Sequence, residues 1–577
     1  MNILGLNVFH ADTSACILKD GKIIAAVEEE RFTRIKHFSG FPKNSIDFCL
    51  KEADINLSNL DVIAVNYNKN YNFKEKLFFS IKNFYTSNFF RRAFFSLKKN
   101  SLNKFFLKNY EIDISQKIKF IPHHLSHISS TFFFEDIKEN CIGFSFDGSG
   151  DFSTIEVYKL GKDIELLEKV NYPNSPGIFY QAFTQFLGFK NYGDEYKVMG
   201  LASYGKPIYK DRLKKLLKLN DNTFFSLNLK YFDHHESVMD YDFESGYPYF
   251  DDLYSKKFEQ LFGKSRKSNE PIKELHKDLA ASLQLVFEEI ILEKLNNLFD
   301  KYKLNGLCIS GGCAFNSSLN GKIINSSKFK KIYISPNVGD AGGAIGSALY
   351  VAKKNNIELK YNDSPYLGTY YSDDYIEKNI LNKLKDPHFF KYKYYEDFKE
   401  LCLVTSKILR QKQSVVGWFQ DKMEWGPRAL GNRSILGDPT NAKMRDIINL
   451  KIKKREEFRP FAPSVIVEKA DEYFEIEGNS KYMCAVYNAK QKAKDLVPSV
   501  VHIDGTSRVQ TVSKEMNFKF YTLLKSFEKL TEVPILLNTS LNVNEPICEN
   551  PENALEIFTK TSMDALIIQN WILTKNV

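Results

Sequence analysis

Apolar and polar positions near the start of the chain follow the short alternation of β-strands. Residues 2–9 and 14–30 alternate or run apolar around two polar turns, at residues 11–13 and 19–22. This pattern predicts a three-stranded meander, with a helix over residues 42–53 after it. The pattern returns at residues 141–170, where a strand, the acidic turn DGSGD and two more strands follow one another. Two such units predict a duplicated α/β domain of two lobes with a cleft between the copies.

Helical spacing appears further along the chain. Residues 272–300 carry apolar positions three and four apart, which predicts a long helix. Strands are expected at residues 306–310 and 331–335, each followed by a glycine-rich loop, and a helix should start at residue 341. The polar, tyrosine-rich stretch at 355–375 indicates a domain boundary. We predict a first domain over 1–355 (lobes at about 1–138 and 139–355, helical insertion at about 71–110), a linker over 356–375 and a second α/β domain over 376–577.

Composition indicates an ordinary globular protein. Hydrophobic residues make up 43% and charged residues 26% of the 577 residues, and no apolar stretch approaches the length of a membrane span. The first residues lack a secretion signal, and the eight cysteines contain no CxxC pair. We therefore expect no transmembrane segment, no disulfide framework and a cytoplasmic location.

Positive charge is concentrated in the predicted insertion. Residues 71–110 hold nine Lys or Arg against one acid, Glu75, and they are rich in phenylalanine. The segment is either an amphipathic surface that attracts phosphate or acidic headgroups, or a helical hairpin whose Phe face packs on the body. We favour the packed hairpin, because burying one helix face is the commonest use of such a pattern. The phenylalanines are Phe73, Phe78, Phe79, Phe84, Phe89, Phe90, Phe94, Phe95, Phe105 and Phe106.

Two histidines and two aspartates are candidate metal ligands. His123 and His127 are four residues apart, so both imidazoles project from one face of a helix that starts at Pro122. A pair at this spacing is more often a surface or core pair, and oxygen ligands from Asp147 and Asp340 are what favour a metal site. Such a mixed nitrogen and oxygen set suits iron, manganese or zinc.

Glycine loops and isolated basic residues suggest phosphate binding. The loops DGSGD, SGG at 310–312 and GDAGG at 339–343 permit close backbone approach at predicted strand ends. In the last third, basic residues stand next to Gly, Pro or aromatic residues rather than along a helix face, which favours bidentate phosphate contacts over a solvated surface. These residues are Arg428, Arg433, Lys453, Arg455, Arg459 and Arg508, and the amide and hydroxyl groups of Asn538, Ser540 and Asn542 are available to the same anion.

The ordered motifs resemble the O-carbamoyltransferase family, which includes nodulation-factor and antibiotic-tailoring carbamoyltransferases. The resemblance covers nearly the whole chain. It implies an N-terminal duplicated actin-like (RNase H-like) domain, similar to the tRNA threonylcarbamoyltransferase subunit, and a C-terminal YrdC-like α/β domain. The motifs are AAVEEERFTRIKHFSGFP, HHLSH, SFDGSGD, GDEYKVMGLASYG, SGGCAFN, GDAGGAIGSA, EWGPRALGNRSIL, KKREEFRPFAPS, DGTSRVQTV and LLNTSLN.

The resemblance also implies roles for particular residues. His123, His127, Asp147 and Asp340 would hold Fe(II) or a similar divalent metal. Asp12 is the candidate for binding or deprotonating the acceptor hydroxyl; His10 is a second catalytic candidate, although Ala11 separates the two where many members read His-Asp. The residues implied to bind the nucleotide or carbamoyl phosphate are Lys36, Gly148, Gly177, Glu195, Gly311, Gly312, Asn316, Arg428, Lys453, Arg455, Arg459, Arg508, Asn538 and Ser540.

The resulting prediction is an O-carbamoyltransferase that uses ATP, Mg and carbamoyl phosphate to make carbamoyl-AMP. It would pass the carbamoyl group to a hydroxyl of a small molecule: a sugar, nucleotide sugar or secondary metabolite. No nucleic-acid partner is expected, and a homo-oligomer stays open. One alternative is tRNA threonylcarbamoylation, which needs a basic surface for tRNA; residues 71–110 are the only candidate for it. The other is a non-catalytic actin-like nucleotide-binding module, which would not need Lys453 or Arg508.

Overall fold

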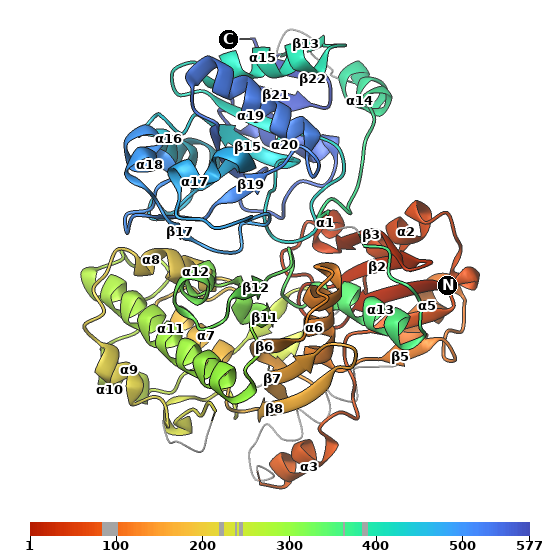
Figure 1. Ribbon diagram of the computed structural model, residues 1–577, viewed down its shortest axis with the longest axis vertical. Coiled ribbons are helices and arrows are strands. Elements are labelled where there is room, and N and C mark those ends of the chain that lie inside the picture. Colours follow the sequence, from red (N-terminus) through yellow and green to blue (C-terminus); the bar gives the residue numbers. More distant parts are fainter. Residues whose placement is uncertain are drawn as a thin grey trace. The chain divides into compact units, whose positions relative to one another are not determined.

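The computed structural model divides the chain into two compact units, Met1–Asp363 and Ser364–Val577 (Figure 1). It describes residues 1–82, 102–218, 224–236, 239–241, 246–361, 364–383 and 390–576. The division between the units falls inside the stretch 356–375, whose composition set it apart in the sequence.

The first sheet of unit 1 has five strands in the order β3-β2-β1-β4-β5. β1, β2 and β3 form an antiparallel meander, as predicted, whereas β4 runs parallel to β1 and β5 parallel to β4. Their bounds are β1 Asn2–Asn7, β2 Ser14–Lys19, β3 Lys22–Glu28, β4 Val62–Val65 and β5 Ile118–Phe120.

The second sheet of unit 1 repeats this topology in the order β12-β11-β6-β7-β8. β6, β7 and β8 form the antiparallel meander, and β11 and β12 add parallel strands beside β6. Because strand order and direction agree between the two sheets, the predicted duplicated, actin-like domain is confirmed. The bounds are β6 Cys141–Gly150, β7 Ser153–Leu160, β8 Glu165–Asn171, β11 Gly306–Ser310 and β12 Lys331–Tyr333.

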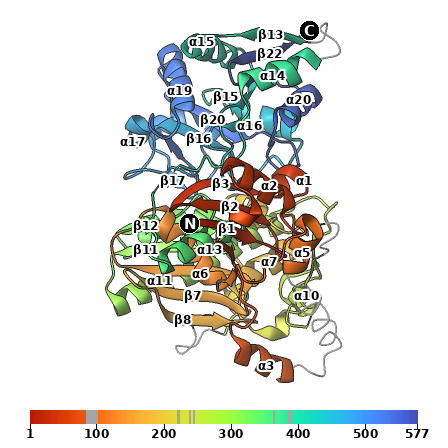
Figure 2. The ribbon, with the colours of Figure 1, turned by 90° about the vertical axis from the view of Figure 1, so that its right-hand side faces the viewer.

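Two helices pack against each other between these sheets (Figure 2). Helix α6, His123–Phe134, follows the first sheet but packs on β6 and β11 of the second, whereas α13, Gly342–Lys354, follows the second sheet but packs on β1, β2 and β4 of the first. Glycine makes the close approach possible. A Cβ on Gly346 would lie 1.8 Å from the backbone oxygen of Ser126, and one on Gly5 would lie 2.0 Å from that of Ala344.

Replacing Gly346 by alanine is therefore expected to lower the free energy of unfolding. The clash is with backbone, so repacking costs about 1–3 kcal/mol or more, which exceeds the gain of about 1 kcal/mol in helix propensity. Denaturant unfolding measures the difference. Gly148→Ala is the matched control, because a Cβ at that position meets nothing within 4 Å. Equal stability of the two variants would contradict the tight crossing of α6 and α13.

The remaining elements of unit 1 surround these layers. The helices predicted at 42–53 and 272–300 are present as α2 and α11. The helices are α1 Glu30–Thr33, α2 Lys43–Glu52, α3 Phe73–Lys82, α5 Leu102–Tyr110, α7 Pro176–Phe186, α8 Glu195–Ala202, α9 Lys210–Lys214, α10 Lys257–Phe262, α11 Glu274–Tyr302 and α12 Ser317–Ser326, and the short strands are β9 Met239–Tyr241 and β10 Pro248–Phe250.

The basic insertion, residues 71–110, matches the packed-hairpin prediction only in part. In α5, Leu102 and Phe106 are buried in the core of the first lobe. In α3, Phe79 contacts Phe152 and Tyr172, but Phe73 and Phe78 are exposed, so the expectation that the Phe face packs on the body is wrong for these two residues. The predicted positions Phe84, Phe89, Phe90, Phe94 and Phe95 lie outside the described residues.

Unit 2 is built on an eight-stranded mixed sheet in the order β13-β22-β21-β14-β15-β20-β16-β19. It is an α/β domain, as predicted, and its particular likeness to the YrdC fold stays a prediction. The strands are β13 Phe390–Tyr394, β14 Val415–Phe419, β15 Arg433–Gly437, β16 Ala462–Ile466, β19 Gln510–Val512, β20 Ile535–Ser540, β21 Ala565–Ile568 and β22 Trp571–Lys575, with the small pair β17 Tyr487–Asn488 and β18 Thr506–Ser507. The helices are α14 Asp373–Asn379, α15 Phe398–Leu409, α16 Met444–Ile447, α17 Ala470–Tyr473, α18 Gln491–Leu496, α19 Phe518–Thr531 and α20 Pro551–Lys560.

Among the described residues, no helix is both long and apolar enough to cross a bilayer.

Candidate active site

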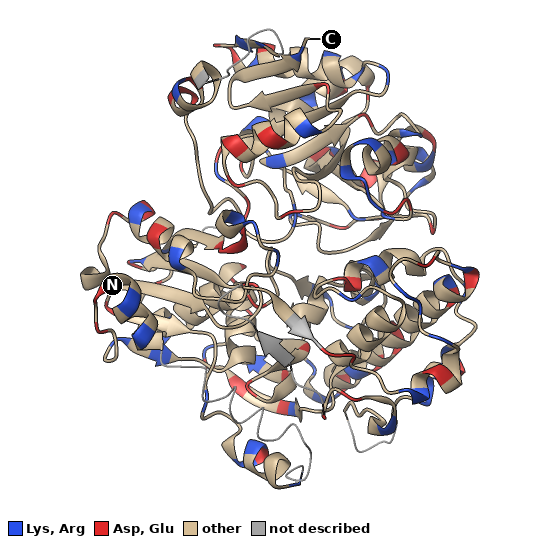
Figure 3. Ribbon diagram, turned by 180° about the vertical axis from the view of Figure 1, so that it is seen from behind, with Lys and Arg blue, Asp and Glu red and all other residues tan. Residues whose placement is uncertain are grey.

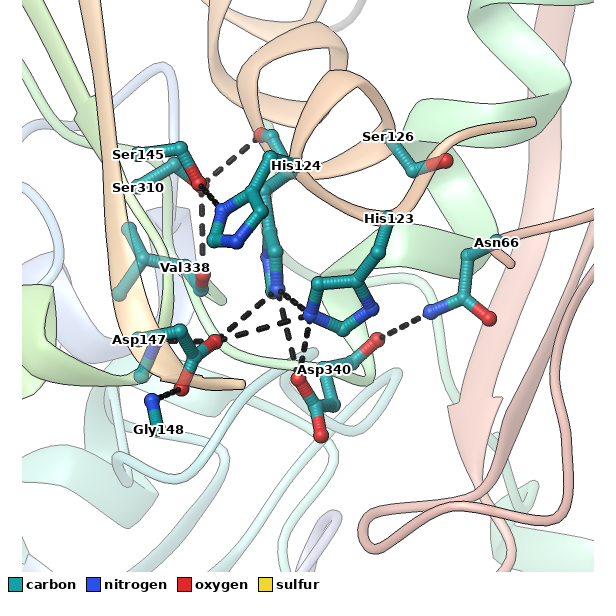
Figure 4. A network of polar contacts seen from close by, with 12 residues as sticks. Asn66, His123, His124, Ser126, Ser145, Asp147, Gly148, Ser310, Val338 and Asp340 are labelled. Carbon is teal, nitrogen blue, oxygen red and sulfur yellow. Dashed lines mark hydrogen bonds and ion pairs between the residues drawn. The ribbon is translucent and has the colours of Figure 1, made fainter. Parts of the chain in front are cut away.

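Four side chains from distant parts of unit 1 converge on one buried point (Figure 4). His123 and His127 lie one turn apart on α6, Asp147 lies in β6, and Asp340 lies in the loop just before α13. The crossing of α6 and α13 brings the histidines to Asp340, and the packing of α6 on β6 brings them to Asp147. The four candidate metal ligands of the sequence are thus placed together.

The distances within this His/Asp cluster match those between ligands of one ion. The two Nε2 atoms are 2.9 Å apart, and His127 Nε2 lies 3.2 Å from Asp147 Oδ2 and 3.3 Å from Asp340 Oδ1. His123 Nε2 lies further out, 3.5 Å from Asp340 Oδ1 and 3.8 Å from Asp147 Oδ2. Ligands about 2.1 Å from a shared metal are about 3.0–3.4 Å from one another. The two imidazoles and two carboxylates therefore fit a divalent ion of the iron, manganese or zinc type.

Neighbouring groups hold the carboxylates of the cluster in place. The backbone N–H groups of Gly148 and Gly312 donate to Asp147, at 2.6 and 2.9 Å. His10 Nδ1 lies 2.7 Å from Asp340 Oδ2, the oxygen that faces away from the histidines. Such outer contacts fix ligand orientation in metal sites. His10 is therefore placed where it positions Asp340.

Charge within the cluster is strongly coupled. Burial by itself lowers the pKa of His127, but hydrogen bonds and charges from Asp147 and Asp340 outweigh it and raise the pKa to about 9. Burial raises the pKa of Asp147, but the hydrogen bonds of the two histidines bring it well below the usual value. The two buried carboxylates thus favour positive charge at this point. A divalent cation bound there would supply it.

His124 differs from its two neighbours on α6. Its Nδ1 lies 2.7 Å from Ser145 Oγ, and burial lowers its pKa to about 4. His124 is therefore a neutral imidazole held by Ser145 and is not a member of the His/Asp cluster.

A second polar group surrounds Asp12 in the turn between β1 and β2. His37 Nδ1 lies 2.7 Å from Asp12 Oδ1, and the backbone N–H of His37 donates to Glu30 at 2.8 Å. Burial lowers the pKa of His37, but the charge and hydrogen bond of Asp12 raise it to about 9. Glu195, at the start of α8, lies close enough to act on this pair electrostatically, and burial raises its pKa to about 7.

Sequence reasoning missed His37. It selected the neighbouring Lys36, which is exposed, because the motif RIKHF gives no sign of which side chain turns toward Asp12. The available signal was a histidine next to a predicted binding residue, but its partner stands 25 positions away in the chain.

The predicted glycines lie around Asp147, and Asn316 stands at the start of α12. Gly177, in the first turn of α7, is so close that a Cβ there would lie 2.6 Å from the nitrogen of Gly148. Gly311 has a positive φ of 94° and donates its N–H to Val338. Asn316 caps α12 and exchanges two hydrogen bonds with Gln284. These contacts show what shapes the loops, while their predicted contacts with a nucleotide stay untested.

Unit 2 gathers four arginines. Burial lowers the pKa of Arg508 well below its usual value, and the positive charges of Arg428, Arg455 and Arg459 lower it further. The guanidinium of Arg455 lies over the ring of Phe461, 4.7 Å from its centroid, and its Nε donates to Asn449. Guanidinium groups that repel one another in this way match an anion with several oxygens, such as a phosphate.

Lys453 belongs to a different arrangement. It is the last residue of a π-helical turn, Ile448–Lys453. Its ammonium is buried and donates to Ser540 O at 2.6 Å and to Asn542 O at 2.7 Å. Asn538 donates to Ser464 and lies buried in β20. Lys453 thus fixes the end of β20, at the predicted Ser540, and the loop that follows it.

Comparison with known proteins identifies the class. The chain matches the family profile described as Carbamoyltransferase N-terminus over residues 2–349 and that described as Carbamoyltransferase C-terminus over residues 407–575. It is 38% identical to the uncharacterized protein sll1178 of Synechocystis sp., over 100% of this chain and 97% of that protein. It is 33% identical to nodulation protein NolNO of Sinorhizobium fredii, over 99% of this chain and 80% of that protein, and 33% identical to NolO of Bradyrhizobium diazoefficiens, over 78% of each. The chain belongs to the carbamoyltransferase family, which confirms the predicted family and enzyme class.

Proposed function

We propose that the protein is an O-carbamoyltransferase that forms carbamoyl-AMP from ATP and carbamoyl phosphate in unit 2 and transfers the carbamoyl group in unit 1. The acceptor is a hydroxyl of a small molecule: a sugar, a nucleotide sugar or a secondary metabolite. The observation that carries the proposal is the presence of two chemically different sites in one carbamoyltransferase, an arginine cluster in unit 2 and a His/Asp cluster in unit 1.

The arginine cluster suits the first reaction. ATP and carbamoyl phosphate are both polyanions, and Arg428, Arg455, Arg459 and Arg508 offer forked donors for their oxygens. Formation of the mixed anhydride releases pyrophosphate from ATP, and atom balance requires that water be consumed and inorganic phosphate be released from carbamoyl phosphate. A non-catalytic binding module would have no use for this second set of phosphate-binding groups.

The His/Asp cluster and the Asp12–His37 pair suit the second reaction. A divalent ion held by His123, His127, Asp147 and Asp340 supplies positive charge that polarises the oxygens of the activated carbamoyl group. Asp12 and His37 orient the acceptor hydroxyl and accept its proton as the hydroxyl oxygen bonds to the carbamoyl carbon and AMP departs. Because the adenylate is reactive toward water, exclusion of water at this point protects it.

Arg508→Ala is expected to slow pyrophosphate release by about 10²–10³-fold, because it removes a preorganised charge from the reacting phosphates. The assay contains ATP, carbamoyl phosphate and Mg and omits the acceptor, with pyrophosphate and phosphate both quantified. His123→Ala should keep most of this partial activity. Arg410→Ala, which removes an exposed arginine paired with Asp438, is the matched control.

Two results would count against the proposal. The first is a well-folded wild-type protein that releases no pyrophosphate in response to carbamoyl phosphate. The second is an Arg508→Ala variant that releases it at the wild-type rate, which would place adenylate formation elsewhere.

A further inference from the structure

Helix α3 presents large apolar side chains to solvent. Phe73 is 61% exposed, Leu77 50%, Phe78 72% and Ile81 65%. Phe73, Leu77 and Ile81 follow one another at four-residue spacing, so they form a stripe along one face, and Phe78 widens it. Figures 1 and 2 both show α3 standing off the sheets of unit 1 beyond β8. Contiguous apolar surface of this kind marks an interaction site on a soluble protein.

The opposite face of α3 is anchored, so the exposure is not that of a detached helix. Phe79 contacts Phe152 and Tyr172, with ring centroids 5.4 and 5.6 Å apart. Glu75 pairs with Lys169 of β8 at 2.9 Å. These contacts fix the rotation of the helix and hold its apolar stripe outward.

Positive charge accompanies the apolar stripe of α3. Lys74 and Lys82 are exposed beside the apolar stripe. The one acid in this helix, Glu75, is paired with Lys169 of β8, and Figure 3 shows the charged positions along the chain. An apolar stripe flanked by exposed lysines, on a helix whose one carboxylate is paired with Lys169, matches a surface that is apolar inside and anionic outside. A soluble acidic protein would match the lysines but would not explain four exposed apolar side chains on one short helix.

We propose that α3 is an interfacial helix that docks unit 1 on a lipid bilayer containing anionic headgroups. Phe73, Leu77, Phe78 and Ile81 enter the boundary between headgroups and acyl chains, and Lys74 and Lys82 remain among the lipid phosphates. The inference is independent of the carbamoyl chemistry, since it rests on α3 alone. One short helix gives weak, reversible binding that depends on lipid charge and salt.

Sedimentation of the full-length protein with vesicles tests the proposal. We expect binding to vesicles of phosphatidylcholine mixed with phosphatidylglycerol, much less binding to phosphatidylcholine alone, and release by salt. The double variant Leu77→Ser/Phe78→Ser should lower the vesicle partition coefficient by about tenfold or more, and Lys74→Glu/Lys82→Glu should abolish the preference for anionic lipid. All four side chains are exposed, so the unfolding temperature should stay unchanged.

Ile208→Ser is the matched control, because Ile208 is an apolar residue of unit 1 exposed to a similar degree outside α3. It should bind vesicles like the wild type. Wild-type protein that stays in the supernatant with anionic vesicles at low salt would overturn the proposal. So would equal binding of the Leu77→Ser/Phe78→Ser variant. A third result would show that a second copy of the chain covers α3 instead. In that case the wild type is a dimer, Leu77→Ser/Phe78→Ser is a monomer, and neither binds vesicles.

Discussion

His127→Ala is expected to remove the bound metal and to stop carbamoyl transfer, while pyrophosphate release in unit 2 continues. His127 Nε2 lies within 3.3 Å of a nitrogen or oxygen of each of the other three members of the His/Asp cluster. The substitution therefore removes the candidate ligand that contacts all of the others. Removing metal assistance worth several kcal/mol corresponds to a decrease of about 10³-fold or more in transfer rate. Elemental analysis of the purified variant measures metal content directly, and transfer is assayed on a panel of sugars and glycosides.

His124→Gln is the control for this experiment. His124 is buried on the same helix, but it contacts Ser145 rather than the carboxylates. The variant should retain stoichiometric metal. If it lost as much metal as His127→Ala, the effect would reflect the packing of α6. Wild-type protein purified without chelators that contains no divalent metal would contradict the metal site itself.

His37→Gln is expected to lower the rate of carbamoyl transfer by about 10²–10⁴-fold, the usual contribution of a positioned acid or base. To accept a proton, the Asp12–His37 pair must first have lost the one on His37. Since the pKa of His37 is raised to about 9, the competent form grows with pH below that value. Transfer by the wild type should therefore increase between neutral pH and about 9 and then level off, and the increase should disappear in His37→Gln.

Pyrophosphate release separates this effect from general damage, because it should be unchanged in His37→Gln. His235→Gln, which removes another histidine of unit 1 paired with Glu236, should leave the pH profile intact. A wild-type transfer rate that stayed flat from pH 7 to 9 would assign proton acceptance to another group.

The sequence predicted the layers of unit 1 well, because strand alternation and acidic turns are local signals. The His/Asp cluster was also predictable, since His123 and His127 share a helix face and Asp147 and Asp340 stand at strand ends near glycines. The pairing of His37 with Asp12 was not, because it depends on how two loops fold back on each other. Periodicity likewise showed that α3 is amphipathic, but only tertiary packing decides which of its faces is covered.

The crossing of α6 and α13 has a consequence for how the chain is made. The first sheet leaves the ribosome early, yet the helix that covers β1, β2 and β4 ends only at Lys354. Until then the nascent chain exposes a bare apolar sheet and lacks Asp340, so it can neither bury that face nor complete the His/Asp cluster. A chain with such an exposed apolar face is prone to aggregate during synthesis. A truncation before residue 342 should therefore yield insoluble protein rather than a folded first lobe.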